Sequence, residues 1–265
     1  MTAGTISTMF SRLKEKCSVP LHYLWMLPLI SGLSWLIMLF TLLFFWIGRG
    51  CPKYPKQSNP YVAMISDIGA FELKPLFITF STLTGLTFIA TISSVHYARY
   101  SPRMYYIQDS TTSSIRTLSI LSIISSVVAG VSLVFLSIFD TFRWHNYHNQ
   151  FLMGCFGGLA GCMVLTTVVY LDQTRKPSRF TRLRFYCTVN MVIVWIEVVL
   201  GVIFVITINT SHYRTAGFLE WTITILGGFY ILAFVGFVAV PDDGVDVHER
   251  DPLLGDQAYI NEVEA

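Results

Sequence analysis

The sequence predicts an all-α protein: a polytopic bundle of six transmembrane helices with both termini in the cytosol. Three observations lead to this fold class. First, 53% of the 265 residues are hydrophobic and only 13% are charged, whereas a soluble domain has about 25% charged residues. Second, the apolar residues are concentrated in six long runs. Third, the basic residues are concentrated in alternate connections between those runs.

Each apolar run is long enough to cross a bilayer as a helix. A helix rises 1.5 Å per residue, so about 20 residues cross a hydrocarbon core of about 30 Å. Only helices and closed barrels satisfy their backbone hydrogen bonds in lipid, and these runs are too long for barrel strands. We expect a cytosolic segment at 1–23, a membrane domain at 24–240 and a disordered acidic cytosolic tail at 241–265. The expected spans are approximately 24–47, 75–97, 115–139, 149–171, 185–208 and 218–240.

The distribution of Lys and Arg predicts the orientation. With the N-terminus in the cytosol, twelve basic residues flank the spans on the cytosolic side and six flank them outside. This excess obeys the positive-inside rule. The connection 172–184 contributes five basic residues and one acid, which also predicts contact with anionic lipid. The sequon at Asn209 then lies outside, at the membrane end of its span.

The first outer loop, about 48–74, is more apolar in its second half than a solvated loop needs to be. We therefore expect it to pack on the outer ends of the bundle. It carries two acids, Asp67 and Glu72. Asp67 is expected to accept hydrogen bonds that fix residues 60–70 on the bundle, near residues 140–148.

The second outer loop is rich in polar and aromatic groups, with Asp140, Arg143, His145 and His148. One interpretation is structural: Asp140 caps the fourth span or pairs with Arg143, and the rings lie at the membrane–water interface. A second is a lipid-headgroup site in which Arg143 binds phosphate as a bidentate donor. Two histidines three residues apart beside an acid also suit a metal ion, but the signature is weak and we predict no metal site. Together with Asp67 and Glu72, these residues form the candidate outer-face site.

Glu197 lies in the middle of the fifth span. An ionised carboxylate at that depth costs a few kcal/mol on insertion scales and usually faces the bundle interior. One interpretation is a protonated side chain that hydrogen bonds with a Ser, a Thr or Asn190. The other is a proton-linked or lipid-binding role. We expect no second buried acid or base beside it.

The sequence lacks the motifs of several other function classes. It has no G-x-S-x-G and no Ser or Cys with an evident base, so no catalytic residue is assigned. Its five cysteines include no zinc spacing, and no cofactor or nucleic-acid partner is expected. Glycines in the fourth and sixth spans predict close helix packing: Gly154, Gly157, Gly158, Gly161, Gly227 and Gly228.

The C-terminal tail contains an acidic dileucine pattern. Glu249 lies four residues before the adjacent pair Leu253 and Leu254. Adaptor complexes bind such pairs in extended tails, because the acid meets a basic patch and the leucines fill apolar pockets. Such patterns also arise by chance. If an adaptor complex binds this pattern, part of the protein passes through endosomes toward the vacuole or lysosome.

The segment Ile65-Ser66-Asp67-Ile68-Gly69-Ala70, followed by Phe139-Asp140 and His148 in the second outer loop, resembles the damage-regulated autophagy modulator (DRAM) superfamily. The likeness extends over about 40–240 and is greatest to the fungal suppressor-of-four-kinase type. That type implies a plasma-membrane regulator of phosphatidylinositol 4-kinase signalling and of lipid distribution between leaflets. The other branches imply an autophagy protein of the lysosome or vacuole, and a factor that remodels the lipid of GPI anchors.

We therefore expect a non-enzymatic integral membrane regulator of lipid organisation and phosphoinositide signalling, or of autophagy. The alternatives are a lipid-remodelling enzyme or cofactor of the GPI-anchor type, and a lipid transporter or scramblase that uses Glu197. The expected partners are membrane lipids, a phosphatidylinositol 4-kinase complex, and an adaptor complex at the tail.

Overall fold

The computed structural model describes residues 23–57, 59–101, 104, 113–175 and 181–239. Six helices in this part of the chain are long and apolar enough to cross a membrane, which confirms the predicted fold class. The predictions for segments 1–23 and 241–265 concern residues that lie almost entirely outside the described part. The helices are α2 (Met26–Gly48), the short α3 (Ile65–Gly69), α4 (Lys74–Tyr100), α5 (Ser113–Ile138), α6 (His145–Arg175), α7 (Thr181–Asn209), α8 (Tyr213–Ala233) and the short α9 (Val235–Val238).

Three spans begin four or five residues earlier than the sequence predicted, among them α7, which begins at Thr181 rather than at 185. α6 begins at His145 rather than at 149, and α8 begins at Tyr213 rather than at 218. The backbone N–H of His148 donates to the carbonyl oxygen of Trp144 at 2.9 Å, so the helical pattern already holds in this polar, aromatic turn. Hydropathy marks the hydrocarbon core, but a helix continues into the interface because its backbone groups still bond internally.

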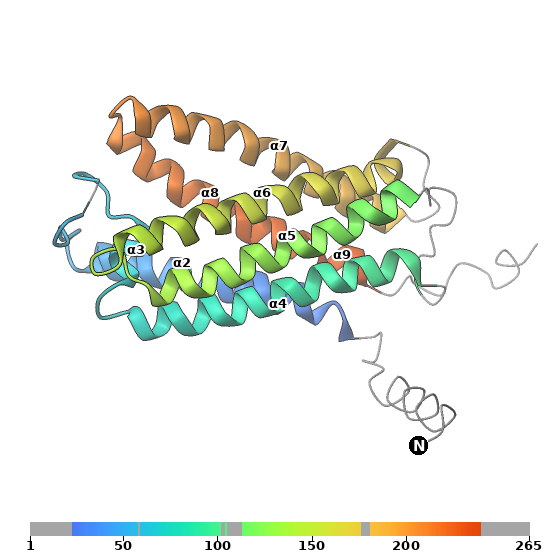
Figure 1. The fold of residues 1–265 in the computed structure, drawn as a ribbon, viewed down its shortest axis with the longest axis horizontal. Coiled ribbons are helices and arrows are strands. Elements are labelled where there is room, and N and C mark those ends of the chain that lie inside the picture. The colour runs from blue at the N-terminus through green and yellow to red at the C-terminus, as the bar shows by residue number, and fades with distance from the viewer. Residues whose placement is uncertain (1–22, 58, 102–103, 105–112, 176–180, 240–265) are drawn as a thin grey trace, which may run out of the picture.

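The six long helices form a closed ring. Each packs against its neighbours in the order α2, α4, α5, α6, α7 and α8, and α8 returns to α2. Figure 1 shows the helices running roughly alongside one another, with α3 and the longest described loop at one end and α9 toward the other. Following the charge prediction, we call the end with α3 the outer end and the opposite end the inner end.

Small residues allow the helices to approach closely. A Cβ built on Gly85 of α4 would lie 2.8 Å from the carbonyl oxygen of Gly130 of α5, and one built on Gly130 would lie 2.9 Å from that of Gly85. Among the predicted packing glycines, Gly158 meets the backbone of α5, and Gly228 meets side chains of α2. The prediction fails for Gly157, whose Cβ would meet nothing within 4 Å. Lipid gives helices no hydrophobic drive to associate, so such close contacts are the main attraction between them.

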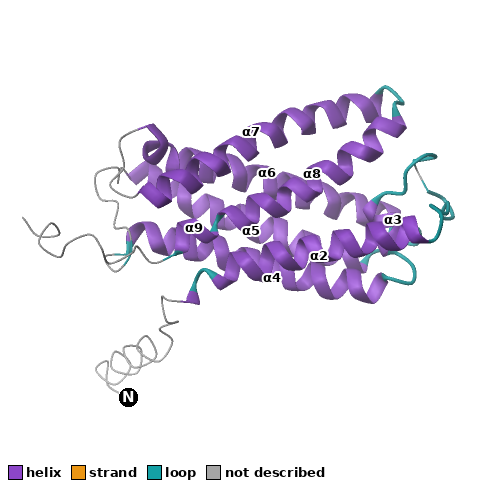
Figure 2. Cartoon of the chain, turned by 180° about the vertical axis from the view of Figure 1, so that it is seen from behind, coloured by secondary structure: helices purple, strands orange, loops and turns teal. Residues whose placement is uncertain are grey.

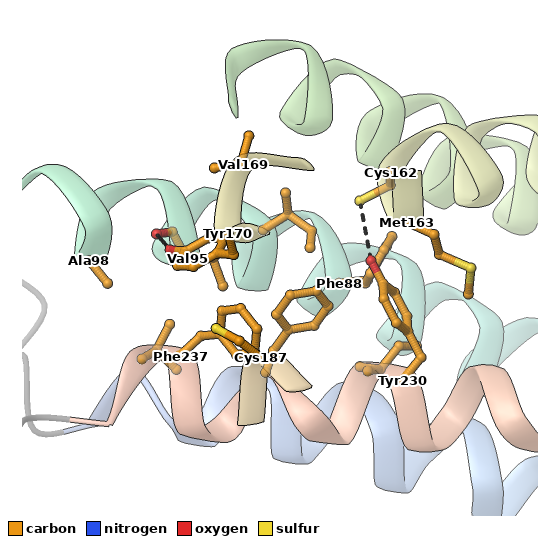
Figure 3. Packing of buried hydrophobic residues seen from close by; sticks show 14 of the residues in the cluster. Phe88, Val95, Ala98, Cys162, Met163, Val169, Tyr170, Cys187, Tyr230 and Phe237 are labelled. Carbon is orange, nitrogen blue, oxygen red and sulfur yellow. Dashed lines mark hydrogen bonds between the residues drawn. The ribbon is translucent and has the colours of Figure 1, made fainter. Parts of the chain in front are cut away.

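Two apolar clusters fill the ring. The inner cluster joins α4, α6, α7, α8 and α9, and includes Phe88, Tyr230 and Phe237. Figure 3 shows side chains of this cluster between the helices, with the hydroxyl of Tyr230 directed at the sulfur of Cys162. The outer cluster joins α2, α3, α4 and α8 around Trp46 and Trp221. It takes in side chains of the first outer loop, which is therefore part of the core.

Candidate functional site

The loop between α2 and α4, residues 49–73, packs on the outer end of the bundle, as the sequence predicted. We call it the outer cap; Figure 2 shows its teal loops and α3 gathered at that end. Val62, Ala63 and Ile68 are buried. The Nε1 of Trp221 on α8 donates to the carbonyl oxygen of Ala63 at 3.1 Å. The cap is thus held on α8 by apolar burial and by hydrogen bonds.

Asn59 organises the start of the cap. Its side chain is 1% exposed. Its Oδ1 accepts the backbone N–H groups of Tyr61 and Val62, and its Nδ2 donates to the carbonyl oxygen of Tyr213. Gly217, one turn along α8, makes room for this contact, because a Cβ there would lie 2.7 Å from Asn59 Nδ2. This role of Asn59 was not predicted from the sequence, although an Asn before a Pro is a common turn signal.

Asp67 lies in α3, where its side chain is 3% exposed. Its Oδ2 accepts the backbone N–H of Met64 at 3.0 Å, which closes the first turn of α3. Burial raises the pKa of this carboxyl to about 6. Asp67 accepts a backbone N–H, as expected, but this bond lies inside the cap rather than between the cap and the bundle, because a short helix must satisfy its own first N–H groups.

The acid that the structure places beside Asp67 is Glu220 of α8. The carboxyl of Glu220 lies beside the backbone N–H of Ile65 and within electrostatic range of Asp67. Its Oε2 is buried and has no hydrogen-bond partner among the described residues. Glu220 lies only seven residues from the start of α8. Glu220 was not predicted as a site residue, although an acid inside the predicted apolar span 218–240 is a signal that the sequence carries.

Asp140 lies in the turn between α5 and α6 and binds two donors. Its Oδ2 accepts from Nζ of Lys74 at 2.8 Å, and its Oδ1 accepts from the backbone N–H of Arg143 at 2.8 Å. Burial alone would raise the pKa of Asp140, but the hydrogen bonds from Lys74 and Arg143 together with their positive charges outweigh it and lower that pKa. The turn is therefore capped by Asp140, and its ion-pair partner is Lys74.

The other outer-face candidates do not converge on one point. His148 is buried, and its Nδ1 lies 2.8 Å from the carbonyl oxygen of Phe139. His145 is exposed and contacts Thr141 and Asn149. Both histidines lie in the first turn of α6 rather than in a loop, one facing the bundle and the other facing outward. The Arg143 residue is exposed, and Glu72 forms an exposed ion pair with Arg49.

The outer face thus holds two separate clusters, one around Asp67 and Glu220 and the other around Asp140 and Lys74. A ring contact between Phe71 and Phe142, with centroids 4.8 Å apart, joins the cap to the second turn. Within the described residues, no group of three or more His, Cys, Asp or Glu side chains is placed to hold a metal ion. The oxygens of Asp140 and one nitrogen of His148 are already bound to protein groups.

Glu197 faces α8 from the middle of α7. The residue is 8% exposed, and a Cβ built on Gly227 would lie 3.9 Å from its Oε1. This oxygen has no hydrogen-bond partner in the described part of the chain. The expected bond to Asn190 is not formed, because Nδ2 of Asn190 donates to the carbonyl oxygen of Tyr230 instead. Asn190 lies two helical turns nearer the inner end of α7, beyond the reach of Glu197.

A third buried charge cluster lies at the inner end. Arg99 of α4, 1% exposed, forms an ion pair with Asp172 of α6 at 3.1 Å and stacks on the ring of Tyr170 at 4.9 Å. This pair lies at the inner end of the bundle and Glu220 lies near the start of α8, so both are buried charged groups away from Glu197 in the middle of α7. From the sequence, Arg99 was only one of the basic residues that flank the spans, because its partner lies 73 residues away.

Comparison with known proteins gives the family. A family model described as Frag1/DRAM/Sfk1/Cwh43P N-terminal domain matches residues 23–236. This chain belongs to the Frag1/DRAM/Sfk1 family. Protein SFK1 of Saccharomyces cerevisiae is 35% identical over 81 residues, and this match covers 30% of the chain and 23% of the yeast protein. No solved structure matches.

The resemblance drawn from the sequence is confirmed by this match. The family domain includes the outer cap, the turn at Asp140, Glu197 and the ion pair between Arg99 and Asp172. The protein is an integral membrane protein of the Frag1/DRAM/Sfk1 family. The dileucine residues Glu249, Leu253 and Leu254 lie beyond both the family domain and the described residues, so their role stays a prediction.

Proposed function

We propose that this member of the Frag1/DRAM/Sfk1 family is a non-enzymatic membrane regulator that organises lipid around it. In this proposal its lipid contacts support phosphoinositide signalling at the plasma membrane, or autophagy at the vacuole or lysosome. The similarity to Protein SFK1 of yeast supports a role of this kind. The expected partners are membrane lipids and, on the cytosolic side, a phosphatidylinositol 4-kinase complex and an adaptor complex.

The observation that carries the proposal is the position of α7 in the ring. The buried residues of α7 are Leu183, Cys187, Asn190, Val194 and Glu197. No later residue of α7 is buried. The outer part of α7 therefore contacts α8 on one side and exposes apolar side chains such as Val202 on the others. Glu197 lies where the buried stripe ends. Ionisable groups at membrane depth usually serve a function, and this one borders the lipid.

The contacts at the outer face support a regulator over a lipid-remodelling enzyme. Acyl transfer needs a nucleophile and a base within hydrogen-bond reach of each other, with a third group that orients the base. Asp140 instead binds Lys74 and the N–H of Arg143, and His148 contacts a backbone carbonyl. His145 contacts an Asn and a carbonyl oxygen. These bonds stabilise the turn before α6.

The test compares Glu197→Gln with Glu72→Gln, which makes the same chemical change at an exposed outer position. Each variant is expressed in cells that lack the protein. An impermeant probe measures phosphatidylserine in the outer leaflet, and a fluorescent reporter measures phosphatidylinositol 4-phosphate in the inner one. We expect Glu72→Gln to restore both readouts and Glu197→Gln to restore neither, at equal abundance in the membrane.

Full rescue by Glu197→Gln would contradict the proposed role of α7. A separate readout addresses the enzyme alternative. If His148→Gln changed the acyl composition of GPI anchors while abundance and sorting stayed normal, the protein would act in lipid remodelling instead.

A further inference from the structure

The outer cap and α8 share a buried pair of carboxyl groups, which the proposed lipid role does not use. Asp67 comes from α3 of the cap, and Glu220 comes from α8 of the bundle. The first turn of α3 lies against both: Met64 N–H donates to Asp67, and the carboxyl of Glu220 lies beside Ile65 N–H, next to Trp221, which donates to the carbonyl oxygen of Ala63. The pair therefore joins the cap to the bundle at one point.

Within the described part of the chain, no cation balances the pair. Among the described residues, the charge that acts on Glu220 is that of Asp67, and no other charged side chain acts on Asp67. The phenol of Tyr54 lies within electrostatic range of Asp67. Arg49 forms an exposed ion pair with Glu72, and Lys74 binds Asp140. The helices packed around the cap contribute apolar side chains to this region: Trp46 of α2, Phe77 of α4 and Trp221 of α8.

Two neighbouring carboxyl groups in an apolar surrounding cannot both ionise at low cost. Burial disfavours each charged form, and like charges repel, so such pairs share a proton. The unpartnered Oε2 of Glu220 is a place where that proton can reside. When the proton leaves, the remaining way to relieve the charge is for the cap to separate from α8 and let water reach both groups.

We propose that Asp67 and Glu220 form a proton-sharing latch, which holds the outer cap on α8 in an acidic medium and loosens it as the pH rises. The latch faces the outer side of the membrane, which is the lumen in an acidic organelle. The cap would then be tighter in the vacuole or lysosome than at a neutral cell surface. The latch depends on cap contacts alone, so it can fail without affecting the proposed function.

The direction and size of the effect follow from Asp67. Burial raises its pKa from 3.8 to about 6, so the docked cap binds a proton that the undocked cap has already released. Docking is therefore favoured at low pH, and the share of this preference that comes from the Asp67 proton is lost as the pH rises from about 4 to about 6. A shift of this size corresponds to a change in the docking equilibrium on the order of 100-fold.

The experiment measures amide hydrogen exchange by mass spectrometry on the full chain in phosphatidylcholine nanodiscs. Rates are taken between about pH 4 and pH 7.5 and corrected for the pH dependence of intrinsic exchange. We expect the protection of residues 59–68 to fall about 100-fold over this range in the wild type. In the double variant Asp67→Asn, Glu220→Gln, the amides keep their side-chain acceptors, and protection should stay high at every pH.

Glu72→Gln, an exposed acid of the same cap, is the matched control and should behave as the wild type. The idea is overturned if wild-type protection is constant with pH, or if the double variant keeps the fall. If calcium at neutral pH restored protection as fully as acid does, the pair would bind a cation rather than share a proton, and the latch proposal would be wrong. If the double variant does not fold, Asp67→Asn alone should still abolish the fall between about pH 4 and pH 6.

Discussion

Replacing Asp140 tests whether the second outer turn is a structural element. Asp140→Ala removes the acceptor of the Arg143 N–H, a loss that typically costs about 1 kcal/mol at a helix start. It also leaves Lys74 without its partner. Breaking a buried ion pair costs about 3–5 kcal/mol, but the Lys74 side chain is 29% exposed, so water compensates for much of this and about 1–2 kcal/mol remains. We expect a total loss of about 2–3 kcal/mol in the free energy of unfolding.

Two matched variants divide this loss into its parts. Asp140→Asn keeps an acceptor for Arg143 N–H but removes the charge, so it should cost about 1–2 kcal/mol. Glu72→Ala breaks an ion pair whose side chains are 53% and 57% exposed, and should cost less than about 0.5 kcal/mol. The assay is reversible unfolding in mixed micelles, followed by circular dichroism. The reasoning is refuted if Asp140→Ala is as stable as Glu72→Ala, or if Asp140→Asn is as damaging as Asp140→Ala.

The pH dependence gives a second check on the same residue. The pKa of Asp140 is lowered in the folded protein, with the Lys74 and Arg143 hydrogen bonds outweighing burial. A depressed pKa contributes stability that is present above the unfolded value of 3.8 and is lost as the pH falls through the folded value. The stability difference between wild type and Asp140→Asn should therefore shrink below about pH 4. A difference that stays constant would mean that the charge of Asp140 contributes nothing.

Three further predictions concern topology, sorting and packing. An impermeant amine or thiol reagent should label a reporter at Lys56 from outside and a reporter at Lys176 only after the membrane is opened; outside labelling at Lys176 would reverse the charge argument. Changing Leu253 and Leu254 to Ala should move a fluorescently tagged chain from endosomes and vacuole to the plasma membrane, and an unchanged distribution would remove the vacuolar interpretation. Gly130→Val should destabilise the bundle by about 1–3 kcal/mol, because a Cβ there lies 2.9 Å from a backbone oxygen of α4; unchanged unfolding in micelles would contradict this packing.

The sequence by itself determined the six spans, their approximate ends and the packed first loop. Each follows from properties that add up along a short stretch of chain: hydropathy over about 20 residues, the count of basic flanks, and apolar content in the loop. These properties do not depend on which helix lies beside which. The spans are therefore found to within a few residues, and the largest errors occur at the starts His145, Thr181 and Tyr213, where a helix extends into the interface.

The partners of the charged residues were decided only by the tertiary structure. From the sequence, Arg143, three residues away, was the predicted ion-pair partner of Asp140. In the structure α4 lies beside α5, so Asp140 pairs with Lys74, 66 residues away. Asp67 meets Glu220 because the cap folds onto α8, and Arg99 meets Asp172 across α4 and α6. A buried charge binds whichever polar group the packing brings within reach, since hydrocarbon provides none. The order of helices in the ring sets that choice, and no local pattern in the sequence encodes it.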